Sequence, residues 1–237
     1  MPIFHSTDLI SPGTVVGSFG SAKALANCSK SNAEASCDLA EIRLDLLIQQ
    51  GIRPTRTDWA HLGGIPLLFT ARREDEGGAN QLNAASRMEL LRLALPDVAL
   101  IDIEVASISE MKDLLDELRK EAVPWVASYH DFTQLPPTEA LKDALEKAAA
   151  AGAAVFKAAA RVTCPADLAR LADFQSENHG IAVATMGMGP LAPSSRLLCA
   201  QSGSVLNYGY LGDAPTAPGQ WPAQLLKQAI SASGSGH

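Results

Sequence analysis

The chain has 237 residues, of which 47% are hydrophobic and 19% are charged, and this balance is that of an ordinary globular protein. Its formal net charge of −7 argues against a nucleic-acid partner, because binding nucleic acid requires a basic face. No apolar run approaches the ~20 residues that a membrane helix needs, so we expect no membrane association.

The two ends of the chain and its cysteines favour a cytoplasmic protein. The first ten residues lack the basic start and the long apolar core of a signal peptide. The four cysteines include no closely spaced pair, which suits reduced thiols rather than a disulfide framework or a zinc site. They are Cys28, Cys37, Cys164 and Cys199. We expect residues 1–230 to form a single domain and the Ser/Gly-rich residues 231–237 to be disordered.

Eight short apolar runs predict eight β-strands, because runs of this length that are rich in Val, Ile, Leu and Phe are typical of buried strands. The predicted strands are residues 14–19, 39–44, 65–70, 98–104, 124–128, 153–159, 181–185 and 205–209.

Helical patterns fill the intervals between these runs. Residues 84–95 carry leucines on a broad apolar face, and residues 109–119 are amphipathic, with Ser107 or Ser109 as the expected N-cap. Further helices are predicted to begin at Thr138, at residue 163 and at residue 224.

Eight β–α alternations within about 230 residues favour a (β/α)8 TIM barrel, which usually has about this size. A doubly wound open sheet is the alternative. Its dinucleotide-binding version is disfavoured, because no G-x-G-x-x-G follows the first strand.

Charged and polar side chains gather where the predicted strands end. They are Glu41 and Arg43, Arg72 and Glu76, Asp102 and Glu104, His130 and Asp131, and Lys157. In a barrel all these ends meet on one face, where active sites are built. Each residue also has a structural explanation: Asp102 and Glu104, for example, are suited to pairing with Arg or Lys inside the barrel.

Lys157 interrupts an apolar run near its C-terminal end. Burial favours the neutral amine, which is a nucleophile, although a lysine that extends its ammonium group to water is the simpler explanation of this run alone. An amine that attacks a ketone forms an imine, and the protonated imine acidifies the adjacent C–H for a base such as His130. Arginine side chains can bind a substrate carboxylate, and Asp or Glu side chains can accept hydrogen bonds from substrate hydroxyls. Together they predict an imine-forming lyase for a hydroxylated keto acid that needs no cofactor and no metal.

Seven motifs run in order along nearly the whole chain. They are Glu41-Ile-Arg43-Leu-Asp45, Phe69-Thr-Ala-Arg72-Arg-Glu-Asp-Glu76-Gly-Gly78, Ser128-Tyr-His130-Asp131-Phe132, Val155-Phe-Lys157, Met186-Gly-Met188, Ser195-Arg196 and Ala217-Pro-Gly-Gln220. With this order and spacing the chain resembles the type I 3-dehydroquinate dehydratases of the shikimate pathway. The resemblance implies a homodimeric (β/α)8 barrel that converts 3-dehydroquinate to 3-dehydroshikimate.

The resemblance also implies roles for individual residues. Lys157 would form the Schiff base with the ketone. His130 would take the C2 proton and return it to the departing C1 hydroxyl, and Glu76 would orient His130.

Six further residues would bind the substrate. Glu41, Arg43 and Arg72 would contact ring hydroxyls, and Arg196 would hold the carboxylate with help from Gln220. Thr216 stands where the family often has serine, so the hydroxyl is retained. Residues 213–220 carry two prolines and a glycine, which predicts a loop at the barrel mouth, and we expect this loop to close as a lid.

Two other functions fit the residues themselves. One is a class I aldolase for a sugar phosphate, with a phosphate site on the backbone N–H groups of Gly187, Gly189 and Gly203-Ser204. The other is a non-catalytic barrel that binds metabolites, for which the loss of Lys157 or His130 would be expected; both are present.

Overall fold

The computed structural model describes residues 9–79 and 81–234, and within them eight parallel strands form one sheet. The strands are β1 (Val15–Phe19), β2 (Leu39–Arg43), β3 (Leu67–Thr70), β4 (Leu100–Glu104), β5 (Trp125–Asp131), β6 (Val155–Arg161), β7 (Ala182–Met188) and β8 (Asn207–Leu211). From β1 to β7 each strand pairs with the next in sequence, and β1 also pairs with β8, so β7 and β8 are the two edges of the sheet.

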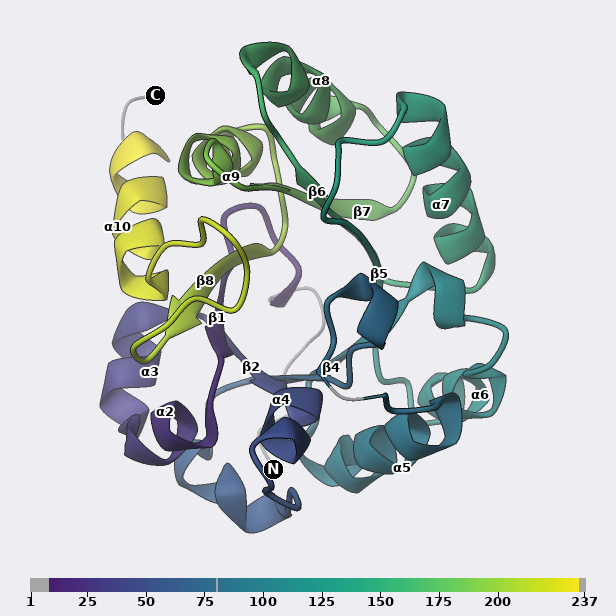
Figure 1. The fold of residues 1–237 in the computed structure, drawn as a ribbon, viewed down its shortest axis with the longest axis vertical. Coiled ribbons are helices and arrows are strands. Elements are labelled where there is room, and N and C mark those ends of the chain that lie inside the picture. Colours follow the sequence, from purple (N-terminus) through teal and green to yellow (C-terminus); the bar gives the residue numbers. More distant parts are fainter. Residues whose placement is uncertain (1–8, 80, 235–237) are drawn as a thin grey trace.

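The sheet curls into a nearly closed barrel. Between β7 and β8 the Val205 N–H donates to the Val183 carbonyl oxygen (3.2 Å). Figure 1, which looks into the barrel, shows the helices as a ring around the strands. The predicted (β/α)8 barrel is therefore confirmed, and the alternative of a doubly wound open sheet is wrong.

Helices occupy the intervals between strands. They are α2 (Ala22–Asn27), α3 (Lys30–Ser36), α4 (Leu44–Gln49), α5 (Ala84–Ala94), α6 (Lys112–Lys120), α7 (Thr138–Ala150), α8 (Pro165–Ser176), α9 (Ala192–Gln201) and α10 (Ala223–Gly234). Short 3-10 turns lie at η1 (Arg56–Asp58), η2 (Ala60–Leu62), η3 (Glu74–Glu76), η4 (Leu95–Asp97) and η5 (Val105–Ser107).

Apolar side chains form two cores. The outer core lies between strands and helices and includes the edge-to-face pair Trp59–Phe69, whose ring centroids are 4.9 Å apart. The inner core includes Leu39, Leu68 and Leu100, which are fully buried. Because these residues precede the polar residues of the same strands, the polar side chains are confined to the carboxyl end of the barrel.

All eight predicted strands are present, but β5 and β6 extend further than predicted. Their pairing continues through His130 opposite Ala159 and Asp131 opposite Ala160. Lys157 is therefore the third of seven residues in β6, and the prediction that it ends the strand is wrong. The strand extends beyond the predicted apolar run, because backbone hydrogen bonds between strands continue through residues whose side chains face a polar cavity.

Two details of the predicted helices are also wrong. Helix α6 begins after Met111 without a side-chain cap, because the Ser107 hydroxyl donates to Glu104 instead (3.1 Å). Helix α5 buries Arg87, Leu91 and Ala94, whereas Leu93, on the predicted apolar face, is exposed.

Helix α10 continues to Gly234, so residues 231–234 of the predicted disordered tail are helical. The Ser233 hydroxyl donates to the Ala229 carbonyl (2.8 Å), and Gln201 Nε2 donates to Ser233 Oγ (2.6 Å). These bonds stabilise the last turn of a segment whose composition favours disorder. Residues 235–237 lie outside the described residues.

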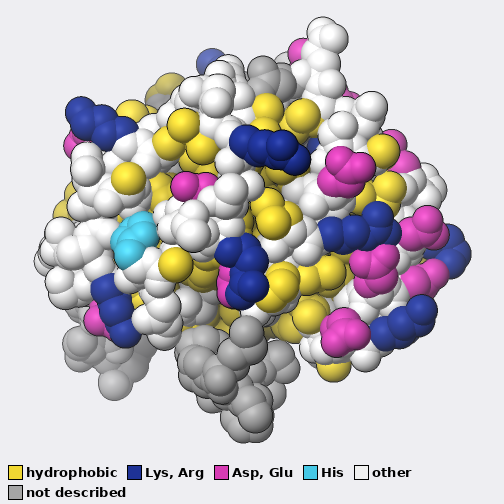
Figure 2. Space-filling model, turned by 90° about the horizontal axis from the view of Figure 1, so that it is seen from below, with side chains coloured by type: hydrophobic (Ala, Val, Ile, Leu, Met, Phe, Trp, Pro, Cys, Tyr) yellow, Lys and Arg dark blue, Asp and Glu magenta, His cyan; other side chains and the backbone are white. Residues whose placement is uncertain are grey.

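Surface charges of both signs are interspersed on the side of the molecule shown in Figure 2. Exposed pairs of the chain include Arg92–Glu117 and Lys112–Asp116, each at 2.5 Å. Within the described residues, no helix combines the length and the apolar character that crossing a bilayer requires.

The contact between β8 and α10 provides a test of the packing. A Cβ added at Gly209 would lie 2.4 Å from Ala223 Cα, so the helix backbone itself would have to move. We expect Gly209→Ala to lower the free energy of unfolding by about 1–3 kcal/mol, the usual cost of overpacking. Urea denaturation would measure this loss as a lower midpoint, with the dependence of the free energy of unfolding on urea concentration unchanged.

The matched control is Gly234→Ala, because outside its own helical turn no atom of the described residues lies within 4 Å of a Cβ added there. Its free energy of unfolding should change by less than about 0.5 kcal/mol. Equal midpoints for the two variants would contradict the close packing of β8 on α10.

Candidate active site

All the residues expected at the site line one cavity at the carboxyl end of the barrel. They are Glu41, Arg43, Arg72, Glu76, His130, Lys157, Arg196, Thr216 and Gln220. They come from four strands (β2, β3, β5 and β6) or the segments that follow them, from α9 and from the loop between β8 and α10. The cavity volume is about 50 Å³, room for a few waters at most.

Lys157 is held in the middle of the barrel by Asp102. Lys157 Nζ donates to Asp102 Oδ2 (2.8 Å), and the two residues expose 3% and 1% of their surface. Burial lowers the pKa of Lys157 below its ordinary value, and the Asp102 carboxylate offsets part of this effect. The amine is therefore both fixed in position and deprotonated more readily than a surface lysine.

Asp102 remains ionised because two cations outweigh its burial. Burial alone would raise the pKa of Asp102, but Arg72 and Lys157 hold it well below its usual range. Arg72 Nη1 lies 2.8 Å from Asp102 Oδ1, and the Ser128 hydroxyl donates to the same oxygen (2.6 Å).

Glu104 extends this network toward α5. Its Oε1 accepts from Arg72 Nη1 (2.9 Å), and its Oε2 accepts from Arg87 Nη1 (2.7 Å). The suitability of Asp102 and Glu104 for pairing with basic residues inside the barrel is confirmed. The contacts of Arg72 with Asp102 and Glu104 go through its Nη1, and Arg72 also lines the cavity.

His130 and Glu76 form the other titratable pair. Glu76 Oε2 accepts the His130 backbone N–H (3.0 Å) and lies 2.9 Å from Nδ1. When Glu76 is ionised, Nδ1 carries the proton, which leaves Nε2 as the basic nitrogen. Burial raises the pKa of Glu76 to about 7, with contributions from Glu104 and Asp102. Burial, with Arg72 and Lys157, lowers the pKa of His130 well below 6.5.

Glu41 and Arg43 both line the cavity, but they are not paired with each other. Glu41 accepts hydroxyl hydrogen bonds from Ser18 (2.5 Å) and Thr70 (2.7 Å). Arg43 makes a bidentate contact with buried Asp45 (2.9 and 2.7 Å), because α4 begins directly after β2 and places Asp45 beside it.

Arg196 has no acidic partner among the residues that the structure describes, although only 2% of its surface is exposed. Its Nη1 donates to the Tyr208 carbonyl (2.6 Å), and its Nε has no partner in that part of the chain. Burial lowers the pKa of Arg196 to about 10, so it is still a cation at neutral pH. Burying a cation without an anion is costly, and an anion that entered the cavity would offset this cost.

The loop between β8 and α10 covers the cavity. Gln220 is 6% exposed, and its Oε1 accepts from both the backbone N–H and the hydroxyl of Thr216 (2.8 Å each). The Gly189 N–H donates to the Pro218 carbonyl (3.1 Å), which joins the loop to the end of β7. In Figure 1 this loop lies over the barrel beside α10.

Ser18 and Tyr208 line the cavity and Arg87 supports it from α5, and none of the three was predicted from the sequence. Phe132, Met186 and Met188, which belong to the quoted motifs but were given no role, also line the cavity. Tyr208 could have been found, because it lies two residues after buried Leu206 and so faces the same side of β8. Within residues 9–79 and 81–234, no three His, Cys, Asp or Glu side chains gather as metal ligands would.

The phosphate site that an aldolase would need is not available in this conformation. The Gly187 N–H donates to Ser195 Oγ (2.9 Å) and the Gly189 N–H to Pro218. The Gly203 and Ser204 N–H groups donate to carbonyls at the end of α9.

Comparison with known proteins agrees with the residues in the cavity. The model of the family described as type I 3-dehydroquinase matches residues 18–237. The chain is 31% identical over 217 residues to the 3-dehydroquinate dehydratase of Methanosarcina barkeri, covering 85% of this chain and 88% of that one. It is 32% identical over 224 residues to that of Haloquadratum walsbyi, covering 90% and 91%.

The fold is also shared with solved structures. The 3-dehydroquinate dehydratase of Geobacillus kaustophilus superimposes with a TM-score of 0.78 at 25% identity, covering 94% of this chain and 91% of that one. The enzyme of Enterococcus faecalis superimposes with a TM-score of 0.79 at 23% identity, covering 98% and 99%. By sequence and by fold, this chain belongs to the type I 3-dehydroquinase family.

Proposed function

We propose that this chain is a 3-dehydroquinate dehydratase, a lyase of the shikimate pathway, and that it acts through an imine between Lys157 and the substrate ketone. The proposal depends most on one observation: a buried lysine amine lies 2.8 Å from Asp102 in the cavity that also contains His130. Membership of the type I 3-dehydroquinase family supports the choice of substrate.

Lys157 attacks the ketone as a neutral amine, which its lowered pKa makes available. The protonated imine then withdraws electrons from the adjacent carbon. His130 Nε2 takes the C2 proton, and the resulting enamine expels the C1 hydroxyl, which leaves as water with a proton from His130. Water finally hydrolyses the imine and releases 3-dehydroshikimate and the free amine.

The remaining cavity residues hold the substrate at both ends. Arg196, a buried cation without an acidic partner in the described chain, binds the carboxylate, and Gln220 assists from the loop. Glu41, Arg43 and Arg72 contact ring hydroxyls, and Arg72 also holds Asp102 and Glu104 in place.

The loop between β8 and α10 acts as a lid. The cavity of about 50 Å³ is too small for a cyclic acid, so the loop must open to admit the substrate. Once closed again, it excludes the water that would hydrolyse the imine early.

Borohydride added with substrate should reduce the imine and inactivate the protein. The ligand mass should appear on the Lys157 peptide in peptide mass spectrometry. Lys157→Ala should have no measurable activity and should take up no label. A label on another lysine would rule out the proposed nucleophile.

His130→Ala should lower kcat by at least ~10²-fold, because it removes the general base. Glu76→Gln should cost less, and it should also move the acid limb of the kcat/KM profile. In the parent enzyme the His130–Glu76 pair should take up a proton near pH 7, because the pKa of Glu76 is raised to about 7. In Glu76→Gln only His130 of this pair titrates, so the acid limb of the profile should move to a pH below 6.5.

Steady-state rates between pH 5 and 9 would measure both effects. An acid limb at the same pH in Glu76→Gln and in the parent enzyme would show that Glu76 is not part of the titrating pair.

Backbone amide exchange should detect the lid. Residues 213–220 should exchange faster in the free enzyme than with 3-dehydroshikimate bound, because the ligand holds Gln220 and Thr216 in place. Gln220→Ala should raise KM and remove this difference. Equal exchange with and without ligand, together with normal kinetics of Gln220→Ala, would mean that the loop is static.

A further inference from the structure

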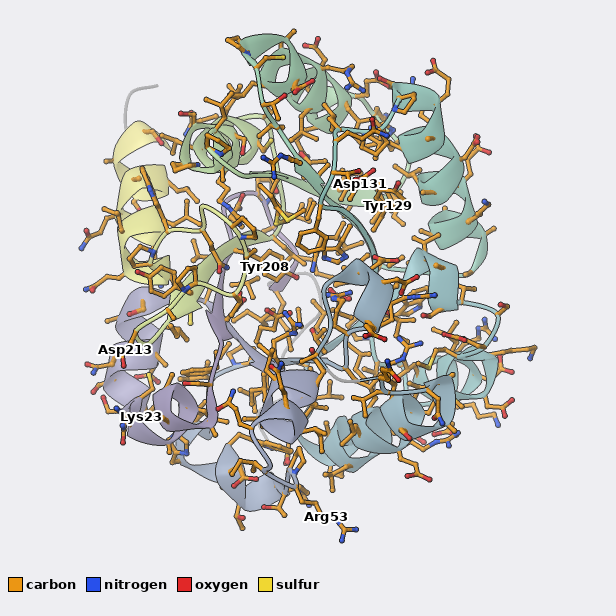
Figure 3. The ribbon with its side chains drawn as sticks, in the orientation of Figure 1. Lys23, Arg53, Tyr129, Asp131, Tyr208 and Asp213 are labelled. Carbon is orange, nitrogen blue, oxygen red and sulfur yellow. The ribbon has the colours of Figure 1, made fainter. Side chains whose placement is uncertain are left out.

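Tyr208 is a cavity residue that the reaction above leaves without a role. It lies on β8 with 4% of its surface exposed, and Lys157 Nζ lies 4.4 Å from the centroid of its ring. In Figure 3 Tyr208 lies inside the barrel, whereas Tyr129 lies on the outer side of β5 toward α7. Among the residues that the structure describes, the Tyr208 hydroxyl has no hydrogen-bond partner.

The other hydroxyls around Lys157 already have acceptors. Ser18 and Thr70 donate to Glu41, and Ser128 donates to Asp102. A buried hydroxyl without a partner destabilises the folded protein, and such a cost is tolerated chiefly where function needs the group. The Tyr208 hydroxyl is therefore available for an oxygen that enters the cavity with the ligand.

This hydroxyl keeps its own proton at any pH at which the enzyme would work. Burial raises the pKa of Tyr208 well above its ordinary value, and Asp102 and Glu41 raise it further. It therefore acts as a hydrogen-bond donor and not as an acid that gives up its proton.

We propose that the Tyr208 hydroxyl binds the oxygen that leaves the substrate ketone as Lys157 forms the imine, and that returns as water when the imine is hydrolysed. The inference rests on the imine function proposed above. The carbon that bears this oxygen becomes bonded to Nζ, so the oxygen comes within two bonds of an atom that lies against the Tyr208 ring.

The step balances without another reactant. Overall, the ammonium form of Lys157 and the ketone give a protonated imine and one water. One proton leaves the nitrogen before the neutral amine attacks, and a second leaves it afterwards. A C=N double bond replaces the C=O double bond, and both protons end on the departing oxygen. Tyr208 donates a hydrogen bond to that oxygen throughout and returns to its starting state.

Oxygen exchange isolates this step, because the ketone of the product can form and hydrolyse the imine without repeating the elimination. Purified enzyme is incubated with saturating 3-dehydroshikimate in water enriched in oxygen-18, and mass spectrometry follows label entering the ketone above the uncatalysed rate. Tyr208→Phe keeps the ring against Lys157 but removes the hydroxyl. It should slow this exchange about 3- to 10-fold, the loss expected for one hydrogen bond.

Two further measurements separate this role from a structural one. Tyr208→Phe should melt at the same temperature as the parent enzyme or higher, because it removes an unpartnered buried hydroxyl. Tyr129→Phe, the same deletion outside the cavity, should exchange at the parent rate.

Exchange by Tyr208→Phe at the parent rate would overturn the inference, and so would a rise in KM with unchanged exchange at saturation. In either case borohydride labelling of Lys157 in the parent enzyme would leave the imine function standing. A parent enzyme that neither exchanges the oxygen nor takes the label would overturn both.

Discussion

The site depends on one buried carboxylate, Asp102, and the two cations that it holds. Arg72 and Lys157 contact its two oxygens at 2.8 Å each, and all three residues are at least 97% buried. Removing one member of such a group leaves an uncompensated buried charge, which is strongly destabilising. Burial lowers the pKa of Lys157, and the buried position is tolerated because Asp102 lies beside the amine. The position of the amine and its lowered pKa therefore both depend on Asp102.

Charge is distributed unequally around the barrel mouth. From β2 to β6 the protein forms buried ion pairs, in Arg43–Asp45, Arg72–Glu104 and Lys157–Asp102, while the Glu41 carboxylate is held by two hydroxyls. Buried polar atoms that no described residue satisfies remain in Arg87, beside Glu104, and in Arg196 and Tyr208 on the other side. In the proposed function a ligand supplies the missing partners of Arg196 and Tyr208.

Apolar periodicity predicted the architecture, and polar residues at strand ends predicted part of the cavity, because both are local signals. Arg196, Thr216 and Gln220 came from the family resemblance, and Ser18 and Tyr208 were missed. The sequence was not sufficient for the pairing. Arg87 lies on a helix whose leucines pointed to a different buried face, and its burial depends on Glu104, which is distant in sequence. Ser107 was expected to cap a helix, but its hydroxyl donates a hydrogen bond to Glu104 instead. Whether Lys157 is a surface or a buried lysine was likewise decided by Asp102, a contact that spans 55 positions.

The division of the mouth into two halves has a consequence for how the family can diversify. Lys157, His130 and Glu76 are held by β3 to β6 and the segment after β3, whereas Arg196, Thr216 and Gln220 belong to α9 and the loop before α10. In the proposed function the second group binds the carboxylate, so substitutions there would change which acid is recognised and would leave in place the strands that carry the amine and the imidazole. A redesigned loop between β8 and α10 would then be a route to new substrates for the same reactive lysine.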